Sequence, residues 1–101
     1  MKEYKIEIFE KKEGAEIHFS GNLIINNIEK IVEEIRENVS MERGYTVFID
    51  NPENIDITFI QLIISIRKQI EANGNKLAVK ATLKDDVRQL IQKAGLENTI
   101  K

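Results

Sequence analysis

Residues 51–74, NPENIDITFIQLIISIRKQIEANG, join a short acidic turn to a long helical pattern. The run YTVFI at 45–49 comes just before them and is typical of a buried strand, because it is rich in β-branched and aromatic residues. Residues 50–54 end that strand, since Asp, Asn and Pro favour turns. After the turn, apolar residues recur at helical spacing up to a predicted helix end at 73–74; they are Phe59, Leu62, Ile63, Ile66 and Ile70.

Thr58 is predicted to lie at the N-terminus of this helix, two residues after Asp56. A hydroxyl at that position is either a helix N-cap or a regulated site, because threonine caps helices and also accepts phosphate. The residues alone favour the cap. Loss of a cap costs about 1 kcal/mol of stability, which is what we expect for Thr58→Ala.

The composition is that of an ordinary soluble globular protein. The 101 residues suffice for one core, so we expect a single domain over residues 1–101. Hydrophobic residues make up 42% of the chain and charged residues 32%. With 15 Lys and Arg against 17 Asp and Glu, the formal net charge of -2 gives no attraction to nucleic acid, which we do not expect as a partner.

Residue types exclude several kinds of site. The chain has no cysteine and one histidine, which rules out thiolate chemistry and leaves too few groups for a catalytic triad. We therefore expect no catalytic residue, no enzyme activity and no cofactor. Asp50, Glu53 and Asp56 offer carboxylates to a cation, but a turn without a glycine-punctuated ligand loop predicts no metal site. No apolar run is long enough for a bilayer, so we expect a cytoplasmic protein without membrane insertion.

The N-terminal part of the chain predicts a hairpin. Apolar residues alternate in strands at 4–9 and 15–20, and Gly14 lies in the turn between them. The two strands are expected to pair in antiparallel fashion. By the same alternation His18 points away from Ile17 and Phe19, toward the more solvated face of the sheet.

The remaining elements alternate between helix and strand. A helix is expected to start at 26–29 with a cap-like asparagine, and its apolar stripe is Ile28, Ile31, Val32 and Ile35. The strand at 45–49 lacks polar alternation, which predicts cover on both faces. A strand at 76–81, a third helix capped by Thr82 and ended by Gly95, and a short strand at 98–101 follow. This order predicts an α/β layered fold, with a mixed sheet that has an N-terminal antiparallel hairpin and helices in parallel crossovers.

Several of these features together resemble the STAS domain, the fold of the anti-sigma factor antagonists. The hairpin ends in Ser-Gly-Asn-Leu at 20–23, where the family has a glycine followed by a small polar or acidic residue and leucine. The apolar strand, the turn with Asp56, the following helix and the Ala-Gly-Leu at 94–96 occur in the family's order. The resemblance covers nearly the whole chain and implies a STAS-like fold.

The family motif after the central strand is Asp-Ser-Ser-Gly-Leu, and its second serine is phosphorylated by a partner kinase that is also an anti-sigma factor. The matching residues here are Asp56, Ile57, Thr58, Phe59 and Ile60. The resemblance therefore makes Thr58 the candidate phosphorylation site. Ile57 departs from the first serine and Phe59 from the glycine, and Phe59 is expected to be fixed in the core.

Three classes of function follow from these features. The resemblance implies a non-catalytic protein-interaction module whose partner is an anti-sigma factor, a switch kinase or another signalling protein. An alternative is an accessory subunit of a larger assembly, such as a lipid-transport ATPase, without a phosphorylation switch. A small-ligand binder is a further alternative, which is disfavoured because the sequence contains no glycine-rich phosphate loop.

Two isoleucines of the long helix, Ile60 and Ile64, belong neither to its apolar stripe nor to its polar side. Such residues either pack against a neighbouring helix or form an exposed patch that binds a partner. The second alternative predicts a partner-binding surface at the start of the helix, made of Asp56, Thr58, Ile60, Gln61 and Ile64. A lysine at position 64 separates the two, because it destabilises a core position and removes only the partner at an interface.

Overall fold

The structure is a computed structural model that describes residues 3–12, 14–85 and 88–89. Its helices and strands alternate in the order that the sequence predicts, which confirms the α/β class. The elements are β1 (Tyr4–Lys11), β2 (Gly14–Leu23), a 3-10 turn η1 (Ile25–Asn27), α1 (Ile28–Asn38), β3 (Tyr45–Asp50), β4 (Asn54–Ile55), α2 (Ile57–Ala72) and β5 (Leu77–Thr82).

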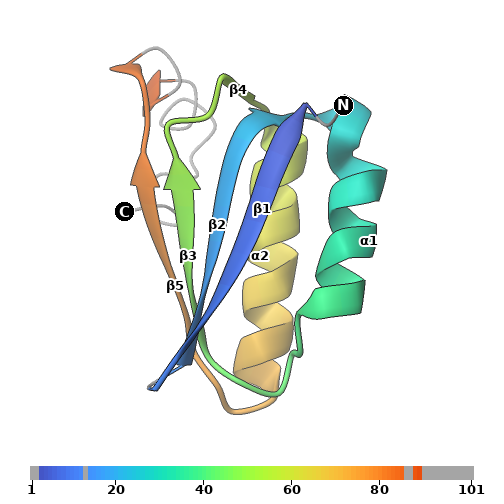
Figure 1. The fold of residues 1–101 in the computed structure, drawn as a ribbon, viewed down its shortest axis with the longest axis vertical. Coiled ribbons are helices and arrows are strands. Elements are labelled where there is room, and N and C mark those ends of the chain that lie inside the picture. The colour runs from blue at the N-terminus through green and yellow to red at the C-terminus, as the bar shows by residue number, and fades with distance from the viewer. Residues whose placement is uncertain (1–2, 13, 86–87, 90–101) are drawn as a thin grey trace.

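The main strands form one mixed sheet in the order β1-β2-β3-β5 (Figure 1). β1 pairs with β2 in antiparallel fashion, whereas β2 with β3 and β3 with β5 are parallel. Helix α1 connects the first parallel pair and α2 the second. The antiparallel hairpin and the helical crossovers are thus confirmed. The two-residue strand β4, which pairs with the end of β2, begins at Asn54, the last residue of the segment that the sequence predicts as a turn.

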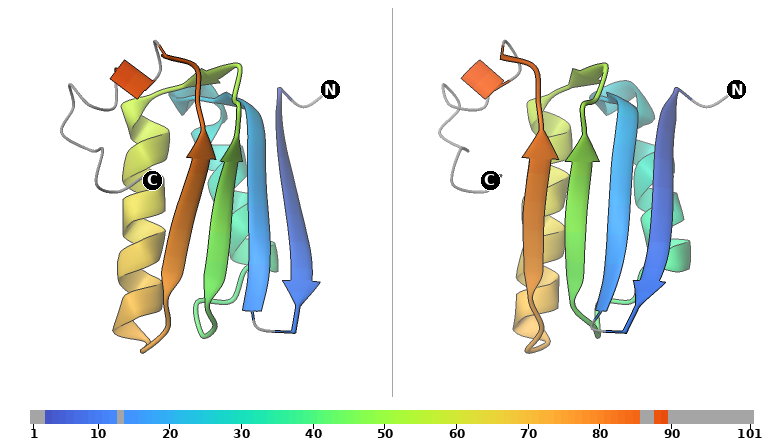
Figure 2. Two further views of the ribbon diagram at one scale, coloured as in Figure 1. Left: turned by 90° about the vertical axis from the view of Figure 1, so that its left-hand side faces the viewer. Right: turned by 60° about the vertical axis from the view of Figure 1, so that its left-hand side comes forward.

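Both helices lie on one face of the sheet, and the opposite face is turned toward the viewer in the left view of Figure 2. The core between helices and sheet contains side chains at most 1% exposed, among them Ile17, Phe19, Val47, Ile49, Phe59 and Ile63. Intervening residues of β3 are half-buried, so burial alternates along the strand. The prediction that β3 is covered on both faces is wrong for the described residues. The strand has an apolar residue on its open face because the ring of Phe48 stacks on His18, with ring centroids 4.4 Å apart.

Gly21 allows β1 to lie close to the end of β2. A side chain at this position would place its Cβ 2.6 Å from the carbonyl oxygen of Glu3 and 2.8 Å from Cα of Tyr4. The backbone of Gly21 also has a φ of +86°, which favours glycine. The amide of Asn22 donates to the Glu3 carbonyl at 2.9 Å. The glycine in the Ser-Gly-Asn-Leu motif is therefore required by this close approach.

Two predicted caps differ from the structure. Thr82 is the last residue of β5 and pairs with Asp50, because the strand runs further than its apolar residues indicate. The cap-like asparagine, Asn26, lies inside the 3-10 turn η1, and the actual N-cap of α1, Asn27, makes no side-chain cap bond. The side-chain amide of Asn27 donates instead to the Asn22 carbonyl at 2.9 Å.

Residues 85 and 88–89 are helical, so the third helix is present but begins two residues later than a cap at Thr82 predicts, and the Arg88 amide donates to the Lys84 carbonyl at 2.9 Å. The rest of that helix, Gly95 and the predicted strand at 98–101 lie outside the described residues. Within the part of the chain that the structure describes, no helix has the length and apolar character needed to cross a membrane.

Candidate functional site

Asp56 caps the N-terminus of α2. Its backbone is extended, with φ -127° and ψ 176°, and its Oδ1 accepts a hydrogen bond from the Phe59 amide at 3.3 Å. This corrects the prediction that Thr58 is the cap. The helix starts at Ile57, two residues earlier than a cap at Thr58 predicts, so Thr58 falls inside the first turn, where a side chain no longer reaches the free amides as a cap does.

Asp56 also ties α2 to the segment that leads into α1. Its second carboxylate oxygen, Oδ2, accepts a hydrogen bond from the backbone amide of Ile25 at 2.8 Å. Its own amide donates to the Leu23 carbonyl at 3.2 Å. The carboxylate thus binds amides at the beginnings of both η1 and α2, where negative charge is favourable. The starts of the two helical segments are held at one end of the molecule.

The other predicted partner-binding residues do not all lie on the surface. Thr58 is partly exposed in the first turn of α2, and Gln61 is exposed one turn later. Ile60, in contrast, is 1% exposed and belongs to the core, and Ile64 is half-buried against that core. The expectation that Ile60 is an exposed anchor is therefore wrong. Its side chain follows the alternative of packing inside the fold, as part of the core cluster.

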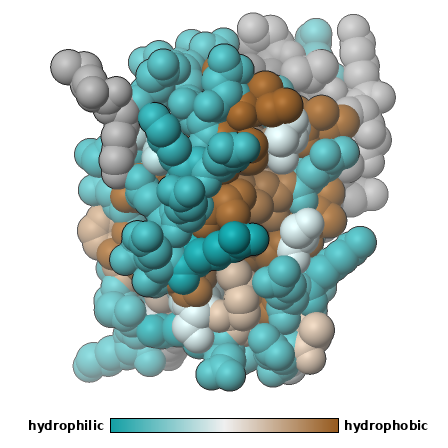
Figure 3. All heavy atoms as spheres, turned by 90° about the vertical axis from the view of Figure 1, so that its right-hand side faces the viewer, coloured by the Kyte–Doolittle hydropathy of each residue, from teal (hydrophilic) through white to brown (hydrophobic). Residues whose placement is uncertain are grey.

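Two exposed isoleucines beside Asp56 are not among the predicted residues. Ile25 is 61% exposed and Ile57 is 50% exposed, and Asp56 holds the amide of the first and precedes the second. We call Ile25 and Ile57 the isoleucine pair. Figure 3 shows hydrophobic surface between hydrophilic regions on the side of the molecule where α1 and α2 lie. A helical projection at 100° per residue places Ile57 about 200° from Phe59, on the side opposite to the apolar stripe, so the sequence did indicate that Ile57 is exposed. Ile25 has no such signal, because it lies in a 3-10 turn.

The family model for the STAS domain matches residues 6–101. The chain belongs to the STAS domain family. No curated protein matches the sequence. Family membership at this level indicates a protein-interaction module of the kind to which anti-sigma factor antagonists belong, and STAS domains are generally non-catalytic.

In this STAS domain the residues of the motif lie in different environments. Asp56 is the cap, Ile57 is exposed, and Thr58 is partly exposed. Phe59 is 0% exposed, and its ring meets Phe19 edge to face with the ring centroids 5.1 Å apart. The prediction that Phe59 is fixed in the core is confirmed. The residue that replaces the family's first serine, Ile57, therefore adds an apolar side chain to the surface next to Thr58.

The acidic residues of the central turn do not converge. The Asp50 carboxylate binds His18 on the open face of the sheet, whereas Asp56 caps α2. Glu53 is exposed, and its amide donates to the Gly21 carbonyl at 2.8 Å. Among the described residues, no group of three or more His, Asp and Glu side chains is placed to hold a metal ion.

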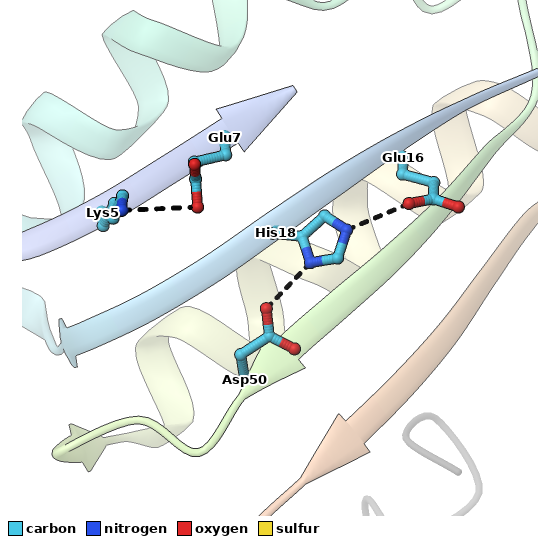
Figure 4. Close-up of polar contacts among 5 residues, drawn as sticks. All are labelled: Lys5, Glu7, Glu16, His18 and Asp50. Carbon is cyan, nitrogen blue, oxygen red and sulfur yellow. Dashed lines mark hydrogen bonds and ion pairs between the residues drawn. The ribbon is translucent and has the colours of Figure 1, made fainter. Parts of the chain in front are cut away.

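His18 lies on the open face, as its alternation predicts, and both of its ring nitrogens contact carboxylates (Figure 4). Nδ1 lies 2.8 Å from Oδ2 of Asp50, and Nε2 lies 3.1 Å from Oε1 of Glu16. Partial burial opposes protonation, but hydrogen bonds to Asp50 and Glu16 outweigh it and raise the pKa of His18 above 6.5. The histidine is thus fixed between two carboxylates, away from the start of α2.

Proposed function

We propose that this STAS domain docks on a protein partner through the N-terminal end of α2. The partner is of the anti-sigma factor or switch-kinase class, and the protein acts in the cytoplasm without catalysis of its own. The isoleucine pair is the observation that carries the proposal. Large apolar side chains rimmed by polar residues are the usual anchors of a protein interface.

The surroundings of the pair fit a docking surface. Asn26, Asn54 and Gln61 are exposed polar residues close to it in sequence, so they supply a polar rim. Asp56 fixes the backbone on both sides of the surface through its two carboxylate oxygens. A surface that is rigid before binding loses less conformational entropy when the partner docks. Of the residues expected from the sequence, Asp56, Thr58, Gln61 and the half-buried Ile64 stay in the proposed site.

Phosphorylation of Thr58 is the regulation that we propose for this surface. Its hydroxyl makes no hydrogen bond to another described residue, and its side chain is partly exposed. Apart from the Asp56 cap, the first turn of α2 contains no acidic residue, so its amides favour an added phosphate. The phosphate would introduce about two negative charges next to the isoleucine pair. Docking of apolar anchors is expected to weaken, because the charge must then lose water at the interface.

Affinity capture from the native cell tests the docking surface. The wild-type domain, Ile57→Lys and the matched control Ser65→Lys are used as baits, since Ser65 is exposed on the same helix. We expect the wild type and Ser65→Lys to capture the same partner and Ile57→Lys to lose it, with all three melting at similar temperatures. Capture of that partner by Ile57→Lys at wild-type levels contradicts the proposed surface.

The phosphorylation step is tested separately with the captured kinase and labelled ATP. We expect label on the wild type and none on Thr58→Ala. If the kinase labels a serine-bearing STAS relative but not this chain, the proposed phosphorylation of Thr58 is contradicted. The role of an accessory subunit in a larger assembly, such as a lipid-transport ATPase, would then be favoured for the same docking surface.

A further inference from the structure

An open pocket lies at the end of the sheet opposite to Asp56, where β2, β3 and β5 begin. Its volume is about 720 Å³, within the range of small-molecule sites. Residues that line it come from the β1–β2 turn, from the start of β3 and from the loop before β5, including Lys11, Lys12 and Lys76. Lys76 is far in sequence from Lys11 and Lys12, so the sequence pattern does not reveal the pocket.

Backbone contacts between the strand starts bring together the segments that carry the lysines. The Tyr45 amide donates to the Lys76 carbonyl at 3.0 Å, and the Ala15 amide donates to the Gly44 carbonyl at 3.4 Å. Gly44 permits this approach, because a Cβ there would lie 3.1 Å from the Lys76 carbonyl oxygen. The three segments therefore meet at the pocket.

Positive charge at the pocket exceeds the negative charge of the described lining residues. Lys12 and Lys76 form no ion pair with a described residue, and Lys11 places its Nζ 5.9 Å from the centroid of the exposed Phe9 ring. The carboxylate that lines the pocket, Glu16, already binds His18 at 3.1 Å. Glu13 in the turn lies outside the described residues. Lysine ammonium groups without carboxylate partners are suited to bind phosphate.

The pocket is also lined by small residues, which include Gly14, Gly44, Thr46 and Ala78. Its volume has room for a ligand body much larger than a single phosphate group. We propose that the pocket binds an organic phosphate, with the phosphate group held by Lys12 and Lys76 and the organic part lying against these small residues. The site is independent of the partner-docking surface, because it lies at the opposite end of the strands.

Amide NMR titration of the full chain with inorganic pyrophosphate tests the site. We expect saturable shifts at Gly14, Gly44 and Lys76, and none at Ile57 or Thr58. The double variant Lys12→Gln/Lys76→Gln is expected to bind about tenfold or more weakly, because it loses two charge-assisted hydrogen bonds. The matched control is Lys30→Gln/Lys68→Gln, which removes the same charge from exposed positions on α1 and α2.

Cosedimentation with vesicles identifies the source of the phosphate. Vesicles of phosphatidylcholine with phosphatidylglycerol are compared with phosphatidylcholine alone. Binding to the anionic vesicles that requires Lys12 and Lys76, without pyrophosphate shifts, assigns the phosphate to a lipid headgroup; pyrophosphate shifts at the pocket assign it to a soluble ligand. The proposal is overturned if neither probe binds, if the control variant loses as much affinity as the pocket variant, or if the shifts map to the start of α2.

Discussion

The two faces of the sheet are built from the same strands but differ in how they are stabilised. On the covered face, Phe19 of β2 and Ile49 of β3 are 0% exposed and pack against the helices. On the open face, the neighbouring residues His18 and Phe48 stay half-exposed and are held by stacking and by carboxylates. Apolar burial therefore gives this fold its stability on one face, whereas polar contacts shape the other. Alternation along a strand lets one sequence serve both purposes.

The largest expected effect is the loss of a covered-face aromatic. Phe59→Ala removes a side chain that is 0% exposed and in contact with Phe19. We expect the free energy of unfolding to fall by about 3–5 kcal/mol, because a cavity adds to the lost apolar burial. Denaturant titration followed by circular dichroism measures it.

The open-face counterpart is Phe48→Ala. Phe48 stacks on His18 but is half-exposed, so we expect a loss of less than about half that of Phe59→Ala. Equal losses of unfolding free energy in the two variants would show that Phe48 stabilises the fold as much as Phe59 does. The proposed difference between the open and the covered face would then be wrong.

A smaller effect is expected at the junction of the two helix starts. Asp56→Ala removes hydrogen bonds to the amides of Phe59 and Ile25 and should cost about 1–2 kcal/mol. Thr58→Ala should cost less than about 0.5 kcal/mol, because Thr58 is not the cap. Thermal melts of both variants measure the difference. A larger loss of stability for Thr58→Ala than for Asp56→Ala would show that Thr58, and not Asp56, stabilises the start of α2.

Periodicity was sufficient to predict the elements whose burial follows a regular pattern. The hairpin, α2 and the parallel crossovers have apolar residues at spacing 2 or 3.6, and these predictions agree with the structure. Two features escape that logic. β4 has two residues, which is too short for any period. β3 shows no polar alternation over residues 45–49, because the open-face residue Phe48 packs on a histidine.

Helix ends and surface clusters depend on contacts that are distant in sequence. Asp56 competes with Thr58 for the cap, and its bond to Ile25, 31 residues away, cannot be read from local spacing. Ile60 lies off the apolar stripe yet is buried, because α2 is enclosed on more than one side. The lysine pocket likewise arises only when the β1–β2 turn, which contains Lys12, and the loop with Lys76 before β5 come to the same end of the sheet on either side of β3. Motifs carried by one segment were predicted, and sites assembled from several segments were not.

The open face should respond to pH through His18. Asp50, Glu16 and, on β1, Glu7 face the ring, and Lys80 of β5 lies in the same row of the sheet. Folding raises the pKa of His18 above 6.5. The stability that protonated His18 contributes is therefore fully present below about pH 6.5 and is lost as the pH rises through the pKa of the folded state. Unfolding free energies of the wild type and His18→Gln, compared from pH 5 to 9, should differ by about 1 kcal/mol at the acid end and converge at the alkaline end.

Below about pH 5 the carboxylates begin to be protonated, so the comparison is confined to higher pH. An NMR titration of His18 in the wild type and in Asp50→Asn gives a second measurement. Loss of one carboxylate should lower the pKa of His18. If the difference in unfolding free energy between the wild type and His18→Gln grows as the pH rises, the contacts of His18 with the two carboxylates in Figure 4 are contradicted.

The smallest effect that we expect is on the titration of the Tyr4 phenol on the covered face. Tyr4 of β1 donates a hydrogen bond to Oε1 of Glu34 on α1 at 2.9 Å. Burial, followed by this hydrogen bond and the negative charge of Glu34, raises the pKa of Tyr4 to about 12. The folded state therefore keeps a proton that the unfolded state loses near pH 10, and stability attributable to Tyr4 declines only as pH rises from 10 toward 12. Absorbance titration of the wild type minus Tyr4→Phe isolates this phenol, and Glu34→Gln should lower its pKa. A tyrosinate that appears near pH 10 in the folded wild type would mean that β1 leaves Tyr4 open to water, and the covered face would then end at β2.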